Sequence, residues 1–304
     1  MTSNTTAPRS PARVPKRPGT AARFFVRLVK EKPLGMTSGI VIVLLIVVAL
    51  FGDQLAPYPY NEMHLSDRLS GPSSQYLLGT DQTGRDVLSR IIFGARISIL
   101  VGLTVTTISV IISTLMGGIS GFVGGKPDMI VQRLVDSWIA FPGLLLMLTV
   151  ISIVGKGLLQ IILILGISGG IAGARVIRSA VIGIRESIYF EMAEAVGSSR
   201  WRSFIRHVLP NITPVIIISF STSVGGVIMA LASLGFLGFG LPPAIPDWGG
   251  MLSREGRKYM EAAPWIALWP GLCLTVTIYS LNMFGDAVRD LLDPRLRGET
   301  AHDH

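Results

Sequence analysis

The sequence predicts an all-α membrane protein with six transmembrane helices. Hydrophobic residues make up 49% of the 304 positions and charged residues only 15%, with a mean hydropathy of +0.56. Six stretches of 18 to 39 residues contain no charged side chain. Because about 20 apolar residues cross the roughly 30 Å of bilayer hydrocarbon, each stretch can hold one crossing.

The six predicted spans lie, in order, within residues 33–52, 97–125, 137–155, 157–174, 208–246 and 262–285. The fifth stretch is long enough for two crossings, but Pro242, Pro243 and Pro246 interrupt its second half. We therefore expect one helix at about 213–236, followed by an irregular external loop. Residues 33–297 form the predicted membrane domain.

The two ends of the chain are polar. Residues 1–32 are rich in Pro, Arg and Lys, which predicts a basic cytoplasmic tail that is partly disordered and then forms a surface helix entering the bilayer. No clear small-x-small cleavage site follows, so we expect the first span to stay in the protein. Residues 298–304 predict a short polar tail.

The distribution of basic residues predicts the orientation. When the amino end is placed in the cytoplasm, 19 of the 27 Lys and Arg residues fall on the cytoplasmic side. Six spans then return the carboxyl end to the same side. In this orientation 53–95 is an external loop, and the polar segment 185–210 between the fourth and fifth spans is cytoplasmic.

The external loop contains the run LGTDQTGRDVLSR at 78–90. It is not a calcium loop, because the alternating ligand positions and the closing Glu are absent. The pattern predicts a tight turn and then an amphipathic interfacial helix. Leu88, Ile91 and Ile92 are expected to face lipid or protein, whereas the expected water-facing side chains are Arg85, Arg90 and Arg96.

The cytoplasmic segment 185–210 predicts two short amphipathic helices that meet at Gly197, a residue suited to a helix C-terminus. The apolar stripe of the second helix consists of Trp201, Phe204, Ile205, Val208 and Leu209, opposite Arg202 and Arg206. Pro210 is expected to end that helix. A polar helix–turn–helix between membrane spans predicts a docking element for a partner protein.

Two groups of charged residues near the spans predict local ion pairs. Asp136 stands three residues after Arg133 near the inner end of the third span, and an unpaired carboxylate would be costly there. The spacing of Asp286, Arg289 and Asp293 predicts a self-paired helix face leaving the bilayer. The middles of the six spans contain no carboxylate, which argues against a proton relay.

Several classes of site are excluded by the pattern. Cys273 is the only cysteine, the four histidines are scattered, and no glycine-rich P-loop is present, so we assign no metal, cofactor or catalytic residue. The net charge of +8 is explained by membrane topology, and nucleic-acid binding is not expected. Serines within the spans lack a neighbouring base, which argues against an intramembrane enzyme.

The segment 185–210 resembles the cytoplasmic loop of ABC importer permeases, which reads Glu-Ala-Ala, three residues, Gly, nine residues, then Ile-x-Leu-Pro. The residues at the family's positions are Glu191, Ala193, Gly197, Leu209 and Pro210, whereas Met192 and His207 replace the usual Ala and Ile. The resemblance implies a permease fold of the methionine-importer type. It also implies that these five residues couple the chain to an ATPase.

Further stretches resemble the second permease subunit of the dipeptide, oligopeptide and nickel importers. They are LGTDQTGRDVLSR at 78–90, DSWIAFPG at 136–143, LGFLGFGLPP at 234–243 with DWGG at 247–250, and NMFGDAVRDLLDPR at 282–295. The resemblance covers about residues 34 to 297. It implies a multi-pass protein of the bacterial inner membrane that has no catalytic activity of its own.

The same resemblance implies the partners and the cargo. A homologous second permease would complete a heterodimer, two ABC ATPase subunits would hold ATP and Mg²⁺, and an external binding protein would deliver di- or oligopeptides. Nickel or another small solute is the alternative cargo. A secondary transporter driven by an ion gradient is the alternative of another class, but it predicts acidic residues within the spans or an inverted repeat.

Overall fold

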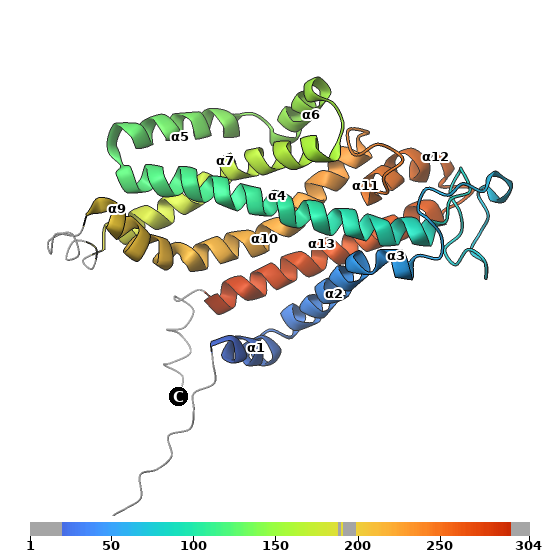
Figure 1. The fold of residues 1–304 in the computed structure, drawn as a ribbon, viewed down its shortest axis with the longest axis horizontal. Helices are drawn as coiled ribbons and strands as arrows, with labels where there is room; N and C mark the ends of the chain where they lie inside the picture. The colour runs from blue at the N-terminus through green and yellow to red at the C-terminus, as the bar shows by residue number, and fades with distance from the viewer. Residues whose placement is uncertain (1–19, 188–189, 191–198, 293–304) are drawn as a thin grey trace, which may run out of the picture.

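The computed structural model describes residues 20–187, Phe190 and 199–292. Every regular element in those residues is a helix, and an isolated bridge pairs Thr80 with Asp86. The long helices pack into an elongated bundle, which confirms the predicted all-α fold (Figure 1). Irregular segments gather near α12 at one end, here called the α12 end. The opposite end is called the α9 end.

The first half of the described chain contains α1 (Thr20–Glu31), α2 (Pro33–Leu50), α3 (Gly52–Leu55), a 3-10 turn at Leu65–Asp67, α4 (Val87–Val123), α5 (Gly125–Ala140) and α6 (Gly143–Val154). The second half contains α7 (Leu158–Arg185), α9 (Arg200–Ser203), a π-turn at Phe204–Val208, α10 (Leu209–Phe236), α11 (Trp248–Gly250), a second π-turn at Met251–Gly256, α12 (Arg257–Tyr259) and α13 (Trp265–Leu292). As predicted, the fifth stretch holds one long helix that ends at Phe236.

Five helices of the described chain are long and apolar enough to cross a membrane, and the third predicted span is a bent pair instead. Helices α5 and α6 meet at an angle of 89°. Phe141 between them is extended, with φ −82° and ψ 138°, because the following Pro142 disfavours a helical conformation before it and has no N–H to donate. Residues 137–155 are therefore not one straight helix. Six spans result when the bent pair is counted as one.

Helix α4 is longer than the second predicted span. It begins at Val87, ten residues before the charge-free stretch, because Asp86 caps it: Ser89 N–H donates to Asp86 Oδ2 over 2.8 Å. Its 37 residues correspond to about 55 Å, well beyond the roughly 30 Å of hydrocarbon. The expected interfacial helix and the second span are thus one continuous helix.

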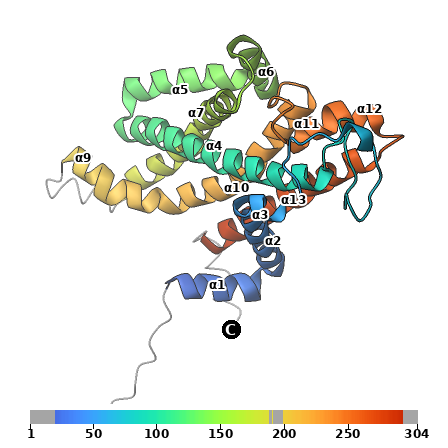
Figure 2. The same cartoon turned by 45° about the vertical axis from the view of Figure 1, so that its right-hand side comes forward.

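Helices α4 and α7 pack so closely that glycines are required between them. A Cβ atom at Gly117 would lie 2.1 Å from the carbonyl oxygen of Ala174, and one at Gly170 would lie 2.6 Å from Cβ of Ile112. At successive contacts the residue numbers rise along both helices, so α4 and α7 run parallel. The chain must therefore return between them, and the α5–α6 pair makes that return (Figures 1 and 2). We call this contact the α4–α7 seam.

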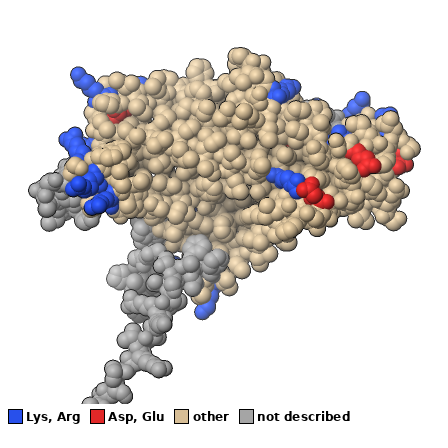
Figure 3. Space-filling view, in the orientation of Figure 1, with Lys and Arg blue, Asp and Glu red and all other residues tan. Residues whose placement is uncertain are grey.

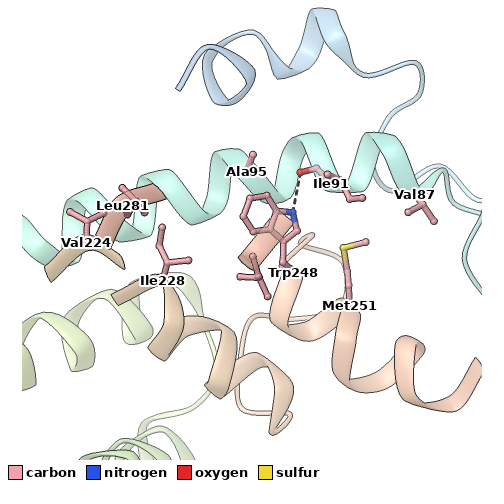
Figure 4. Close-up of a cluster of buried hydrophobic side chains, with 9 residues drawn as sticks. Val87, Ile91, Ala95, Val224, Ile228, Trp248, Met251 and Leu281 are labelled. Atoms are coloured by element: carbon pink, nitrogen blue, oxygen red, sulfur yellow. Dashed lines mark hydrogen bonds between the residues drawn. The ribbon is translucent and has the colours of Figure 1, made fainter. Parts of the chain in front are cut away.

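The loop after α10 is fixed onto α4 by Trp248. Its indole is 1% exposed, and Nε1 donates to the carbonyl of Ile91 over 3.1 Å (Figure 4). Gly94 leaves room for the ring, because a Cβ there would lie 2.6 Å from Nε1. The same buried cluster includes Val87, Ile91, Val224, Ile228 and Leu281, and it joins α4, α10 and α13.

The arginines at the start of α4 are buried, contrary to the prediction that they face water. Arg85 is 4% exposed and its Nε donates to Asp81 Oδ2 over 2.6 Å, while Arg90 is 2% exposed with Nε 3.7 Å from the same oxygen. Both guanidinium groups also approach the carbonyl of Pro243, at 3.4 and 3.5 Å. This buried ion cluster joins the loop before α4 to the loop after α10. The third arginine, Arg96, is half-buried and pairs with the exposed Asp53 at 2.9 Å.

We predict that the buried ion cluster stabilises the α12 end. Asp81→Asn removes the buried carboxylate that Arg85 and Arg90 share, which should cost roughly 3–5 kcal/mol of folding free energy. The matched change Asp53→Asn removes an exposed pair and should cost less than about 1 kcal/mol. Thermal unfolding of the purified protein in detergent measures both. Equal melting temperatures for the two variants would contradict the role of the cluster.

Candidate functional site

The candidate site is the connection from α7 to α10, which holds the five residues predicted to couple to a partner. Leu209 and Pro210 are described, whereas Glu191, Ala193 and Gly197 lie outside the described residues. The described flanks are the end of α7, Phe190, and the continuous helix that starts at Arg200. We call these flanks the connection root.

Three phenylalanines hold the connection root against α4. The ring of Phe122, near the end of α4, lies 6.0 Å from Phe190 in an edge-on contact and 5.0 Å from Phe204. Phe190 and Phe204 are 2% and 7% exposed. They belong to a buried cluster with Ile177, Val181, Val208 and Ile212. The chain on both sides of the connection is thus packed against the ends of α4 and α7.

The residues of the predicted apolar stripe of the second helix do not all face the same way: some are buried and others are exposed. Phe204 and Val208 are buried and Leu209 is half-buried against the same cluster, but Trp201 and Ile205 are 60% and 47% exposed. The indole of Trp201 stacks on Phe204 with 5.4 Å between ring centroids. The two exposed apolar residues therefore form a surface supported from beneath by the connection root.

Basic side chains surround that apolar surface. Arg200, Arg202 and Arg206 are exposed, and Lys and Arg gather at the α9 end of the molecule (Figure 3). The combination of a supported tryptophan with several arginines is typical of a protein-binding surface, where such residues are enriched.

Pro210 does not end the second helix, which corrects the prediction. The helix continues from α9 through the π-turn into α10, and Pro210 lies in the first turn of α10. Leu209 N–H donates to the carbonyl of Phe204, one residue farther back than in an α-helix. This wider turn accommodates the proline, whose ring would otherwise clash with the carbonyl four residues earlier. Asn211 Nδ2 also donates to the carbonyl of His207 over 2.6 Å.

Ion pairs between α5 and α7 support the same end of the bundle. Arg178 donates to both carboxylate oxygens of Asp128, over 2.7 and 2.5 Å. Asp136 pairs with Arg175 on α7, not with Arg133 as predicted. Sequence reasoning missed Asp128, Arg175 and Arg178 because the pairs join residues 39 and 50 positions apart. The only sequence feature that could have indicated these pairs is the eight-residue spacing of Asp128 and Asp136, which places both on one face of a helix.

Comparisons with known proteins give the family. The family described as "Binding-protein-dependent transport system inner membrane component" matches residues 112–298, which include the whole connection. The chain belongs to this family. A second family, "N-terminal TM domain of oligopeptide transport permease C", matches residues 22–72. The resemblance found in the sequence is therefore confirmed, and the chain is a permease subunit of an ABC importer.

Curated relatives match the permease over nearly its full length. The glutathione transport system permease protein GsiD of Pectobacterium atrosepticum is 37% identical, covering 91% of this chain and 92% of the relative. The dipeptide transport system permease protein DppC of Alkalihalophilus pseudofirmus is 37% identical over 88% of each chain. The probable D,D-dipeptide permease DdpC of Escherichia coli K12 is 35% identical, covering 93% of this chain and 96% of the relative.

A solved structure supports the fold. The permease is similar to a chain of the MetNI methionine ABC transporter in an inward-facing conformation, with a TM-score of 0.56 and 15% identity, covering 67% of this chain and 96% of the other. The predicted fold of the methionine-importer type is confirmed. As a member of this family, the permease is a multi-pass, non-catalytic membrane subunit that works with ATPase and binding-protein partners.

We predict that Phe122 anchors the connection root. Phe122→Ala removes the ring between Phe190 and Phe204 and should weaken the root by roughly 3 kcal/mol, so that it opens more often. Trypsin should then cleave after Arg200 and Arg202 about tenfold faster or more. Leu115→Ala is the matched control, because Leu115 lies on the same helix with 55% exposure. An unchanged cleavage rate in the Phe122→Ala protein would rule out this anchor.

Proposed function

We propose that the permease is the second membrane subunit of an ATP-driven importer that takes up di- or oligopeptides. The relatives that support this cargo are named for glutathione, dipeptide and D,D-dipeptide transport, at 35–37% identity over most of the chain. The match of residues 22–72 to the amino-terminal domain of an oligopeptide permease supports the same class.

Transport requires further subunits that this chain does not supply. A homologous, non-identical permease completes a heterodimer and encloses the solute path. Two ATPase subunits bind ATP and Mg²⁺ and drive the cycle. An external binding protein delivers the peptide. The family's dependence on binding proteins supports this assembly.

The observation that carries the coupling role is the surface of Trp201 and Ile205 above the connection root. Both side chains are exposed, both lie among arginines, and both are attached to buried residues of the bundle. A partner that binds this surface can therefore move α4 and α7 together. Glu191, Ala193, Gly197, Leu209 and Pro210 are proposed to complete the docking element for the ATPase.

The α9 end is proposed to face the cytoplasm, together with both termini. The basic side chains at that end support this orientation, because cytoplasmic segments of membrane proteins carry an excess of Lys and Arg (Figure 3). Helix α1 and the last turn of α13 lie toward the same end, and Lys32 pairs with Asp290 between them at 2.5 Å. The α12 end then faces the binding protein.

Driving a conformational change through the connection requires a moderate free energy. Switching a gate from 1:99 to 99:1 requires about 5.5 kcal/mol of differential binding between its two states. Closure of the two ATP-bound ATPase subunits against this surface can supply that free energy. The docking element acts as a lever because its root is rigidly packed, so displacement passes to the helices instead of being absorbed by the connection.

We predict that Glu191→Lys, and separately Gly197→Asp, leave the permease in the membrane but abolish peptide uptake. The first change reverses a charge that is proposed to contact the ATPase, and the second removes the backbone freedom expected of a turn at Gly197. Glu186→Lys is the matched charge reversal, since Glu186 is exposed and outside the family motif. Uptake and peptide-stimulated ATP hydrolysis are measured in the reconstituted importer. Normal uptake by either variant at normal abundance would exclude that residue from coupling.

A further inference from the structure

A polar cavity that is open on one side lies between helices of the otherwise apolar bundle. It has a volume of about 850 Å³ and is bounded by α4, α7, α10 and α13. Its hydrogen-bonding side chains come from three of these helices, and they include Ser109, Ser113, Ser219, Ser223 and Asn282. The fourth helix, α7, supplies mainly backbone, through Gly169 and Gly173.

Glycines keep the polar groups of the cavity uncovered. A Cβ at Gly169 would lie 2.7 Å from the Ser109 hydroxyl, and a Cβ at Gly225 would lie 2.5 Å from Asn282 Oδ1. Side chains at these positions would displace the polar groups. The lack of side chains at the α7 glycines therefore leaves space beside the α4–α7 seam.

Several lining groups remain available to a ligand. Ser109 and Ser113 donate to the carbonyls of Gly166 and Val110, each over 3.0 Å, but their oxygens can still accept. Within the described part of the chain, the side chains of Ser219, Ser223 and Asn282 have no hydrogen-bond partner. The cavity therefore offers both donors and acceptors.

Two opposite charges lie at the α9 end of this cavity. Asp286 and Arg289 are exposed and line it, three residues apart on α13. The sequence predicts that they pair, yet they form no ion pair among the described residues, and Asp293 lies outside those residues. In contrast, the neighbouring Asp290 is held by Lys32 at 2.5 Å. Among the described residues, the two charges lining the cavity thus have no ion-pair partner, whereas the neighbouring Asp290 has one.

This polar lining is incompatible with contact to lipid chains. An exposed amide, carboxylate and guanidinium are costly in hydrocarbon and occur within membrane proteins chiefly where they face water, protein or a solute path. A short peptide presents complementary groups: an ammonium, a carboxylate, and amide donors and acceptors between them. Groups of both charge signs beside uncharged hydrogen-bonding groups match that zwitterion.

We propose that this cavity is this subunit's share of the peptide path, and that Asp286 and Arg289 bind the charged ends of the peptide near its exit. Asn282, Ser219 and Ser223 hydrogen-bond the peptide amides one to several helical turns deeper. The proposal rests on the peptide function proposed above. It assigns specific residues of α10 and α13 to cargo handling, separate from those that couple to the ATPase.

Thiol labelling tests whether the cavity holds water and peptide. Ser223→Cys is made in a Cys273→Ser background, assembled into the importer, and treated with a charged, hydrophilic thiol reagent. The cavity should allow rapid labelling, and delivery of a dipeptide by the binding protein should slow it. Val276→Cys is the control, because Val276 is exposed on α13 outside the cavity and should stay unlabelled in the bilayer. Absence of labelling at position 223 would mean that the second permease covers this surface, and the proposal would be wrong.

Neutral variants test the two charges. Asp286→Asn and Arg289→Gln should each lower dipeptide uptake about tenfold or more, the effect of losing one hydrogen bond to a charged group. Asp290→Asn, one residue from Arg289 but paired with Lys32, should retain uptake. Equal uptake by all three variants and the unmodified importer would overturn the proposal. If the unmodified importer takes up no peptide at all, the proposed function fails instead, so the two failures are distinguishable.

Discussion

The α4–α7 seam is the constraint on which the rest of this permease depends. Between helices in a bilayer no hydrophobic force favours association, so close packing of small residues must supply the attraction. Gly117 and Gly121 on α4, with Gly166 and Gly170 on α7, provide that approach. Because the helices are parallel and their backbones nearly touch, they cannot slide past each other without steric clashes.

Each functional feature is attached to this seam. At the α12 end, α4 carries the buried ion cluster and the Trp248 contact, which fix both irregular loops. At the α9 end, Phe122 of α4 and Val181 of α7 hold the connection root. The polar cavity lies beside the seam, where glycines of α7 leave space. A force applied to the connection therefore reaches the loops and the cavity through one rigid pair of helices.

Much of the fold was predictable from the sequence because charge-free stretches mark helices buried in hydrocarbon. The ranges 33–52 and 262–285 correspond to α2 and most of α13, and the end of α10 at Phe236 followed from the later prolines. The family motif also located the connection. These features depend on composition and local order, which a single sequence contains.

The errors at the arginines and at α5 share one physical cause, which is that pairing across the fold overrides local pattern. Arg85 and Arg90 were assigned to water, but Asp81 and the carbonyl of Pro243 make their burial possible. Helix α5 was missed because its charges are neutralised by α7. Pro210 was taken as a helix end, although a π-turn accommodates it.

A disulfide across the seam tests whether α4 and α7 move as one body. A Cβ at Gly169 would lie 3.4 Å from Cβ of Ser109, close to the roughly 3.5–4.5 Å spacing of a disulfide. In a Cys273→Ser background, Ser109→Cys with Gly169→Cys should cross-link under mild oxidation, whereas Ser109→Cys with Gly183→Cys should not. The cross-link should form equally fast in the nucleotide-free and the ATP-bound importer, because α4 and α7 move as one body. Failure to cross-link, or cross-linking in only one of the two states, would contradict a permanently closed seam.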